Sequence, residues 1–380
     1  MSVQPKFVLA FTATFILALT LLMFPVQAKA DREHGPGTLR SVALLDGPRG
    51  LDALGRGKTL VSEADGSFSL VVEHRRAEAT VVPLGSVPAD FSPAVARGRD
   101  GTVYILTGGA PPDAPSAPGS ATLYAWHSGD LAPAAVADIA AYQATDPDPD
   151  DLEGLPADSN PFGLAPLRDG SVLVADAAGN DLLRVFEDGT IVTVARLAPR
   201  TVEVPAGLPG AGTMIPSEAV ATSVTVGKDG DYYVGELRGY PATPGTSQVW
   251  RIEKGSIDAT CDPEAPRGGA CTRLADGLTS IVDLASDKRR NIYAVSLSTM
   301  SWLAVENGVA GSEVGALWRI GRARGHGHDR DDGHRAPTIT ELLAGQLILP
   351  GGADAVDDTL YLTGPVFGPG GLSKVALKHR

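Results

Sequence analysis

Acidic, amide and hydroxyl side chains that could bind a metal ion recur at related places along this chain of 380 residues. One set stands near the start of short hydrophobic segments: Asp52, Asn160, Thr222, Ser223, Asp283 and Asp354. A second set stands just after neighbouring hydrophobic segments: Glu63, Asp176 and Glu236. Calcium prefers oxygen ligands of these kinds, and a bound calcium ion can polarise an ester or a lactone. The two sets therefore predict a calcium site or a polar ligand site, provided that the fold brings them together.

The elements that carry these residues form a repeat. In its clearest copy, residues 161–176 read as two strands that flank the turn Asp169-Gly170, and residues 182–186 and 190–197 read as two more. Asp-Gly favours the tight turns of β-hairpins. The second strand of each copy ends in a hydrophobic pair, and these pairs are Leu60-Val61, Tyr104-Ile105, Leu173-Val174, Tyr233-Val234, Tyr293-Ala294 and Tyr361-Leu362. Successive pairs lie 44 to 69 residues apart, so the strands recur while their connections vary in length.

Six copies of a four-stranded unit predict an all-β fold, a six-bladed β-propeller. The last copy ends with residues 372–377 and lacks a fourth strand, whereas a strand-like segment, residues 38–45, precedes the first copy. We expect this N-terminal strand to complete the last blade and close the ring, because closure removes an exposed sheet edge. The first set of residues would then lie near the axis. The acidic residues of the second set would either bond to turn backbone in the neighbouring blade or line a polar ligand funnel.

Residues 1–30 have the pattern of a signal peptide. Lys6 precedes a long apolar run, Pro25 ends it, and residues 28–30 place small residues around a cleavage site. We therefore expect export to a secreted or periplasmic location, with one propeller domain over residues 31–380. The alternative is an uncleaved segment that anchors the protein in a membrane.

The mature chain would carry 30 basic and 45 acidic residues, a net charge of −15. An acidic surface without basic clusters argues against nucleic acid and anionic membranes as partners. The expected partner is a small molecule, a glycan or a protein, and the protein is expected to be a monomer.

The chain has two cysteines, Cys261 and Cys271. In an oxidising compartment, a pair this close across a loop rich in Pro and Gly predicts a disulfide. We expect it to join the strands of the outer hairpin of the fourth blade. A metal or redox site is the alternative, but the spacing is not CxxC and no histidine lies nearby.

Two loops are rich in potential metal ligands. Residues 146–153 include five carboxylates and could hold calcium, or they could form a solvated acidic loop. Residues 326–334 include His326, His328 and His334. These histidines could capture zinc, or they could belong to a low-complexity hairpin tip.

Several segments resemble the ScyD/ScyE family of exported six-bladed β-propellers of the NHL and TolB-like kind. The segments are residues 138–142, 158–164, 172–180, 183–185, 221–224, 232–241, 249–252 and 277–284. The resemblance implies this fold and an extracytoplasmic location, and it implies no settled activity. More distantly, the chain is similar to propeller enzymes of the gluconolactonase and paraoxonase type. The axial calcium site of those enzymes would involve Asn160 and Asp283 here, with Asp52 or Glu63 substituting for the acidic residue of the first blade.

Two functions are consistent with these observations. The first is a non-catalytic binding or scaffold protein that uses the central funnel face and needs no cofactor. No Ser–His–Asp type of arrangement is evident in the sequence, and three of the seven histidines lie in residues 326–334. The second is a calcium-dependent lactonase or esterase. We expect the first, and we assign no catalytic residue.

Overall fold

The structure is a computed structural model that describes residues 37–110, 117–321 and 337–377. The predicted signal peptide and the histidines of residues 326–334 lie outside these ranges. Within them, no helix is long and apolar enough to cross a membrane.

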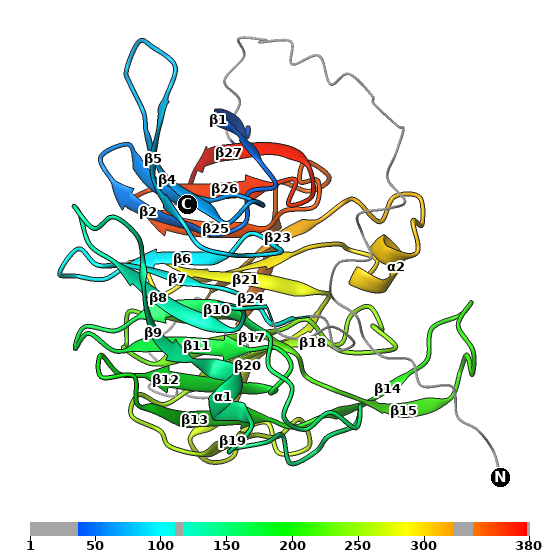
Figure 1. The fold of residues 1–380 in the computed structure, drawn as a ribbon. Helices are drawn as coiled ribbons and strands as arrows, with labels where there is room; N and C mark the ends of the chain where they lie inside the picture. The colour runs from blue at the N-terminus through cyan, green and yellow to red at the C-terminus, as the bar shows by residue number, and fades with distance from the viewer. Residues whose placement is uncertain (1–36, 111–116, 322–336, 378–380) are drawn as a thin grey trace, which may run out of the picture.

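Six antiparallel sheets form the blades of a propeller (Figure 1). Blade 1 is β2 (Leu51–Gly55), β3 (Lys58–Ser62), β4 (Ser67–Val72) and β5 (Thr80–Ser86). Blade 2 is β6 (Ala94–Arg97), β7 (Val103–Leu106), β8 (Thr122–Trp126) and β9 (Ala134–Asp138). Blade 3 is β10 (Pro161–Pro166), β11 (Val172–Asp176), β12 (Asp181–Val185) and β13 (Ile191–Leu197).

The remaining blades follow the same plan. Blade 4 is β16 (Ala221–Val226), β17 (Tyr232–Glu236), β18 (Ser247–Ile252) and β20 (Cys271–Leu278). Blade 5 is β21 (Ile281–Ser286), β22 (Ile292–Ser296), β23 (Ala316–Gly321) and β24 (Thr338–Leu342). Blade 6 is β25 (Gly352–Val356), β26 (Thr359–Gly364), β27 (Pro369–Ala376) and β1 (Arg40–Asp46). The innermost strands β2, β6, β10, β16, β21 and β25 contact one another in this order, and β25 contacts β2.

Both sequence-based predictions about the ring are confirmed. β1 pairs with β27 from Arg40 opposite Lys374 to Asp46 opposite Pro369, so the N-terminal strand completes the last blade. The inner hairpin predicted around the turn Asp169-Gly170 also forms, with Leu164 opposite Val174 in blade 3. The Asp-Gly turns fit because their glycines have positive φ, as at Gly170 (φ 89°), which glycine adopts without a Cβ clash.

The two faces of the ring differ in their connections. We call the face at which the innermost strands begin the entry face. α1 (Ile139–Gln143), the hairpin β14 (Arg200–Glu203) and β15 (Met214–Ser217), and α2 (Trp302–Glu306) belong to connections on this face. In Figure 1, β14, β15 and α2 project from the same side of the ring. The opposite face carries the short turns within the inner hairpins.

Cys261 and Cys271 form the predicted disulfide, but its predicted place was wrong. Cys261 ends β19 (Ala259–Cys261), which pairs in parallel with β13 as a fifth strand on the sheet of blade 3. Cys271 begins β20, the outermost strand of blade 4. The bond therefore joins two neighbouring blades, because the segment between β18 and β20 crosses to the adjacent sheet before it returns.

Removal of this disulfide should destabilise the protein. The bond closes a loop of 10 residues, and the chain-entropy model assigns about 2–3 kcal/mol to a loop of this size. The double variant Cys261→Ala and Cys271→Ala should lose about this free energy of unfolding in urea. Wild-type protein treated with dithiothreitol should behave in the same way, and an unchanged urea midpoint would show that blade packing alone holds β19.

Candidate functional site

Three aspartates of the first set lie on neighbouring innermost strands around the axis. Asp283 of β21 accepts the backbone N–H of Ala353 in blade 6 at 2.7 Å. Asp354 of β25 accepts that of Ala53 in blade 1 at 2.8 Å. Asp52 of β2 accepts that of Arg97 in blade 2 at 2.6 Å. Each carboxyl thus connects its own blade to the next one, from blade 5 round to blade 2.

The axial position also shifts the titration of these carboxyls. Burial raises the pKa of Asp283 to about 7, against an opposing contribution from the Arg49 charge. Burial and the neighbouring Asp52 raise the pKa of Asp354 to about 8. Burial likewise raises the pKa of Asp52, which is hydrogen-bonded to Asp354. The Asp52–Asp354 pair can therefore hold a proton near neutral pH, a property of acid–base groups and of buried structural carboxyls alike.

Sequence reasoning missed Arg49, which closes the axial mouth on the entry face. The guanidinium is buried, donating from Nε to the Ser92 carbonyl and from Nη1 to the Phe162 carbonyl, both at 2.7 Å. It lies 4.1 Å from the centroid of the Phe162 ring and 5.5 Å from that of Phe91. Burial lowers the pKa of Arg49 to about 10, so the group remains charged at neutral pH.

Apolar side chains fill the space around this guanidinium. They include Phe91, Phe162, Val282, Leu297, Val366 and Phe367. The pocket that they leave is large enough for about one water molecule. Among the described residues, Arg49 and these apolar side chains therefore occupy the centre of the entry face.

Asn160 and Thr222 also connect blades. Asn160 accepts the backbone N–H of Gly109, from the connection between β7 and β8, at 3.0 Å. Thr222 of β16 donates to the Ile281 carbonyl of blade 5 at 2.6 Å. The Ser223 hydroxyl is buried and has no hydrogen-bond partner among the described residues.

The acidic residues of the second set do not share one role. Glu63 accepts the backbone N–H of Asp46 at 2.8 Å and so connects blade 1 to the N-terminal strand β1. Asp176 is fully buried and accepts hydrogen bonds mainly from its own blade, among them the Asn160 N–H at 2.7 Å and the Ser159 hydroxyl at 2.6 Å. The expectation that these residues bond to the neighbouring blade was therefore wrong for Asp176, and it was also wrong for Glu236.

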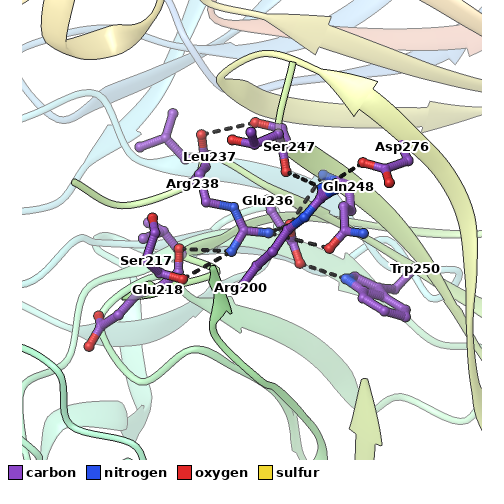
Figure 2. Close-up of polar contacts among 12 residues, drawn as sticks. Arg200, Ser217, Glu218, Glu236, Leu237, Arg238, Ser247, Gln248, Trp250 and Asp276 are labelled. Carbon is purple, nitrogen blue, oxygen red and sulfur yellow. Dashed lines mark hydrogen bonds and ion pairs between the residues drawn. The ribbon is translucent and has the colours of Figure 1, made fainter. Parts of the chain in front are cut away.

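Glu236 forms a buried ion pair with Arg238 within blade 4 (Figure 2). Its side chain also accepts Trp250 Nε1–H at 2.6 Å and the Gln248 backbone N–H at 3.1 Å. Arg238 donates from Nη1 to the carbonyls of Ser217 and Glu218, both at 3.2 Å. The charges of Glu236 and Arg238 compensate each other in a site closed to solvent.

The acidic loop of residues 146–153 meets Glu218, a residue that the sequence did not single out. Asn180 donates from Nδ2 to Asp148 at 2.9 Å and to Glu218 at 3.1 Å, while the Leu152 N–H donates to Glu218 at 2.9 Å. Burial, followed by the charges of Glu218 and other nearby carboxylates, raises the pKa of Glu153 to about 7. The loop thus concentrates negative charge on the entry face beside blades 3 and 4.

The described carboxylates are not grouped as a metal site requires. Over the described ranges, no group of three or more His, Cys, Asp or Glu side chains has the geometry to hold a metal ion. At the acidic loop, the Asn180 amide donor lies between the carboxylates, where a cation would need to sit. At the axis, each of the three carboxyls already gives one oxygen to a backbone N–H.

Comparisons with known proteins agree with the fold. No protein-family model matches the sequence, and no curated protein matches it. Among solved structures, a glucose dehydrogenase is similar at 14% identity, with a TM-score of 0.56 over 90% of this chain and 100% of that one. The PQQ-bound aldose sugar dehydrogenase of Streptomyces coelicolor is similar at 16% identity, with a TM-score of 0.52 over 90% of this chain and 99% of that one. At these identities the likeness establishes the fold alone, and the chain is a six-bladed β-propeller related in architecture to sugar dehydrogenases.

Proposed function

We propose that this protein is a non-catalytic, exported β-propeller of the ScyD/ScyE type, which binds or organises a partner through its entry face. The observation that carries the proposal is the position of the added elements. α1, the β14–β15 hairpin and α2 all belong to entry-face connections. Binding residues are often found on loops that a rigid scaffold positions.

The candidate acids support a non-catalytic role. Asp52, Asp283 and Asp354 bind backbone N–H groups of adjacent blades, and Glu236 is neutralised by Arg238. These bonds explain why the carboxyls are where they are without invoking a reaction. The disulfide between blades 3 and 4 is consistent with export.

The charge of the entry face indicates the kind of partner. Burial, followed by the charges of neighbouring carboxylates that include Asp148, raises the pKa values of Asp150, Glu153 and Glu218. Crowded carboxylates favour a positively charged ligand, because its binding relieves their mutual repulsion. We therefore propose a basic peptide segment or a basic protein surface as the partner.

A short oligolysine peptide tests this proposal by isothermal titration calorimetry. The double variant Asp150→Asn and Glu153→Gln should weaken binding at least tenfold, and added salt should weaken wild-type binding. The matched control, Asp357→Asn and Asp358→Asn, removes two exposed charges from the opposite face and should leave the affinity unchanged. An equal loss of affinity in both double variants would show that the peptide responds only to the net charge of the protein. No binding at low salt would exclude a basic partner.

A calcium-dependent lactonase or esterase of the gluconolactonase-like type is the second candidate function. The observation in its favour is that Asp354 interacts electrostatically with both Asp52 and Asp283 near the axis. It predicts one bound calcium in purified protein, turnover of lactones or aryl esters, and a calcium-dependent rise in Tm that Asp283→Asn abolishes. Asparagine keeps an acceptor for the Ala353 N–H, so this variant should fold. Protein purified in calcium buffer that holds no metal and turns over no lactone or aryl ester would exclude this function.

A further inference from the structure

A buried pair of carboxyls in blade 3 faces a single side-chain amide. Asp176, at the end of β11, and Asp181, at the start of β12, are both fully buried, and so is Gln143, the last residue of α1. Gln143 Nε2 donates to Asp181 Oδ2 at 3.0 Å and to Asp176 Oδ2 at 3.3 Å. Neither the proposed binding surface nor the axial site uses this arrangement.

The two carboxyls differ in their other partners. Asp176 also accepts the Ser159 hydroxyl at 2.6 Å and the backbone N–H groups of Asn160, Ala178 and Gly179 at 2.7, 3.2 and 3.2 Å. A carboxyl with this many donors is satisfied as a carboxylate. Asp181 Oδ1, in contrast, has no hydrogen-bond partner among the described residues, and the same is true of Gln143 Oε1.

These two oxygens are acceptors, so they need a donor. A buried acceptor without a donor costs about 1–3 kcal/mol. A proton on Asp181 would convert its carboxyl into a donor and supply the acceptor of Gln143 at the same time. We infer that Asp181 is a carboxylic acid in the folded protein, donates its proton to Gln143 Oε1, and thereby fixes the end of α1 to blade 3 by two hydrogen bonds.

The charged groups around Asp181 favour this protonation. Burial raises the pKa of Asp181 well above its ordinary value, and the charges of Asp176 on β11 and Asp146 after α1 raise it further. The hydrogen bond from Gln143 and the charge of Arg196 on β13 oppose the shift. Arg196 is paired with Asp146 at 2.6 Å and with Asp258 at 3.1 Å, while its Nη1 has no hydrogen-bond partner among the described residues. The remaining titratable neighbour, Tyr142, is hydrogen-bonded to Thr193 at 2.8 Å.

The hydrogen bonds between Asp181 and Gln143 would hold residues 144–160, which include the acidic loop, in a pH-dependent way. Residues 144–160 continue from Gln143, and the Gln143 amide lies tightly against Gly179, where an added Cβ would be 2.2 Å from Nε2. Because the pKa of Asp181 is raised on folding, its stabilising contribution is complete at acid pH and is lost as the pH rises through the folded-state pKa. Ionisation would then set two carboxylates against one NH₂ group and release the end of α1.

Asp181→Asn tests the inference, because asparagine can keep both bonds without a titrating proton. Its Nδ2 can donate to Gln143 Oε1, and its Oδ1 can accept from Gln143 Nε2. At pH 8 the variant should have a Tm at least about 2 °C above that of wild type, and this gain should disappear near pH 4. Proteinase K should cleave within residues 144–160 faster in wild type at pH 9 than at pH 6, and the variant should lose this difference.

Asp176 provides the control variant, and the ¹³Cγ chemical shift of Asp181 reports its protonation directly. Asp176→Asn should lower Tm at both pH values, because an NH₂ group at the position of Asp176 Oδ2 would face the Gln143 Nε2 donor. In the wild-type protein, the ¹³Cγ resonance of Asp181 should stay at the carboxylic-acid shift at pH 6. A carboxylate shift there would overturn the inference, and so would a Tm lowered by Asp181→Asn at both pH values, the result expected if a water molecule joined an ionised Asp181 to Arg196.

Discussion

Replacement of Glu236 by glutamine is expected to reduce the free energy of unfolding by about 3–5 kcal/mol. Glu236 and Arg238 are 0% and 1% exposed, so glutamine would leave a buried guanidinium without its counter-charge (Figure 2). Glutamine can still accept Trp250 Nε1–H, so most of the loss would come from the uncompensated charge. Guanidinium chloride unfolding followed by tryptophan fluorescence measures the change.

A second variant separates this charge effect from a packing effect. Adding Arg238→Met to Glu236→Gln removes the unpaired charge and should recover part of the lost stability, although the carbonyls of Ser217 and Glu218 then lose the hydrogen bonds from Arg238. Lys288→Met breaks an exposed ion pair with Asp357 and should leave the unfolding midpoint unchanged. If Glu236→Gln and the double variant were equally destabilised, the ion pair would not be the source of the loss.

The sequence predicted the fold because the propeller depends on local patterns. Each inner hairpin needs only a tight turn between two hydrophobic strands, and the turn at Asp169-Gly170 places Leu164 opposite Val174. Closure by β1 was predictable for a related reason, since the last copy lacked a strand and the N-terminus carried a spare one.

The contacts that build the sites were harder to predict from the sequence, because they connect residues far apart in the chain. Arg49 binds the carbonyl of Phe162, 113 residues away, and nothing local to Arg49 indicates that partner. Asn180 lies in a turn, yet its amide joins the acidic loop to Glu218. The disulfide shows the same limit, since the cysteine spacing predicted the bond but not the passage of β19 to the sheet of blade 3.

Arg49→Met is the second substitution with a large expected effect, about 3–5 kcal/mol of unfolding free energy. Its guanidinium donates to blades 2 and 3 through the carbonyls of Ser92 and Phe162, while its own carbonyl accepts the Thr363 hydroxyl of blade 6 at 2.7 Å. Methionine fills part of the volume but donates to neither carbonyl, and buried hydrogen bonds from a charged donor contribute about 1.5–3 kcal/mol each. The lost contact with the Phe162 ring adds to the cost, and relief from burying a charge offsets part of it.

The location of the destabilised strands tests the axial role of Arg49 more sharply than the loss of unfolding free energy does. Because the guanidinium joins blades at the centre of the ring, amide hydrogen exchange should accelerate first in the innermost strands β2, β6 and β10, before the outer strands respond. Arg49→Lys should be almost as destabilising, since an ammonium group cannot reproduce the two diverging N–H donors of the guanidinium. Arg168→Met, which replaces an exposed arginine on the opposite face, should leave stability unchanged. A wild-type exchange pattern in Arg49→Met would mean that the aromatic side chains hold the innermost strands together without the arginine.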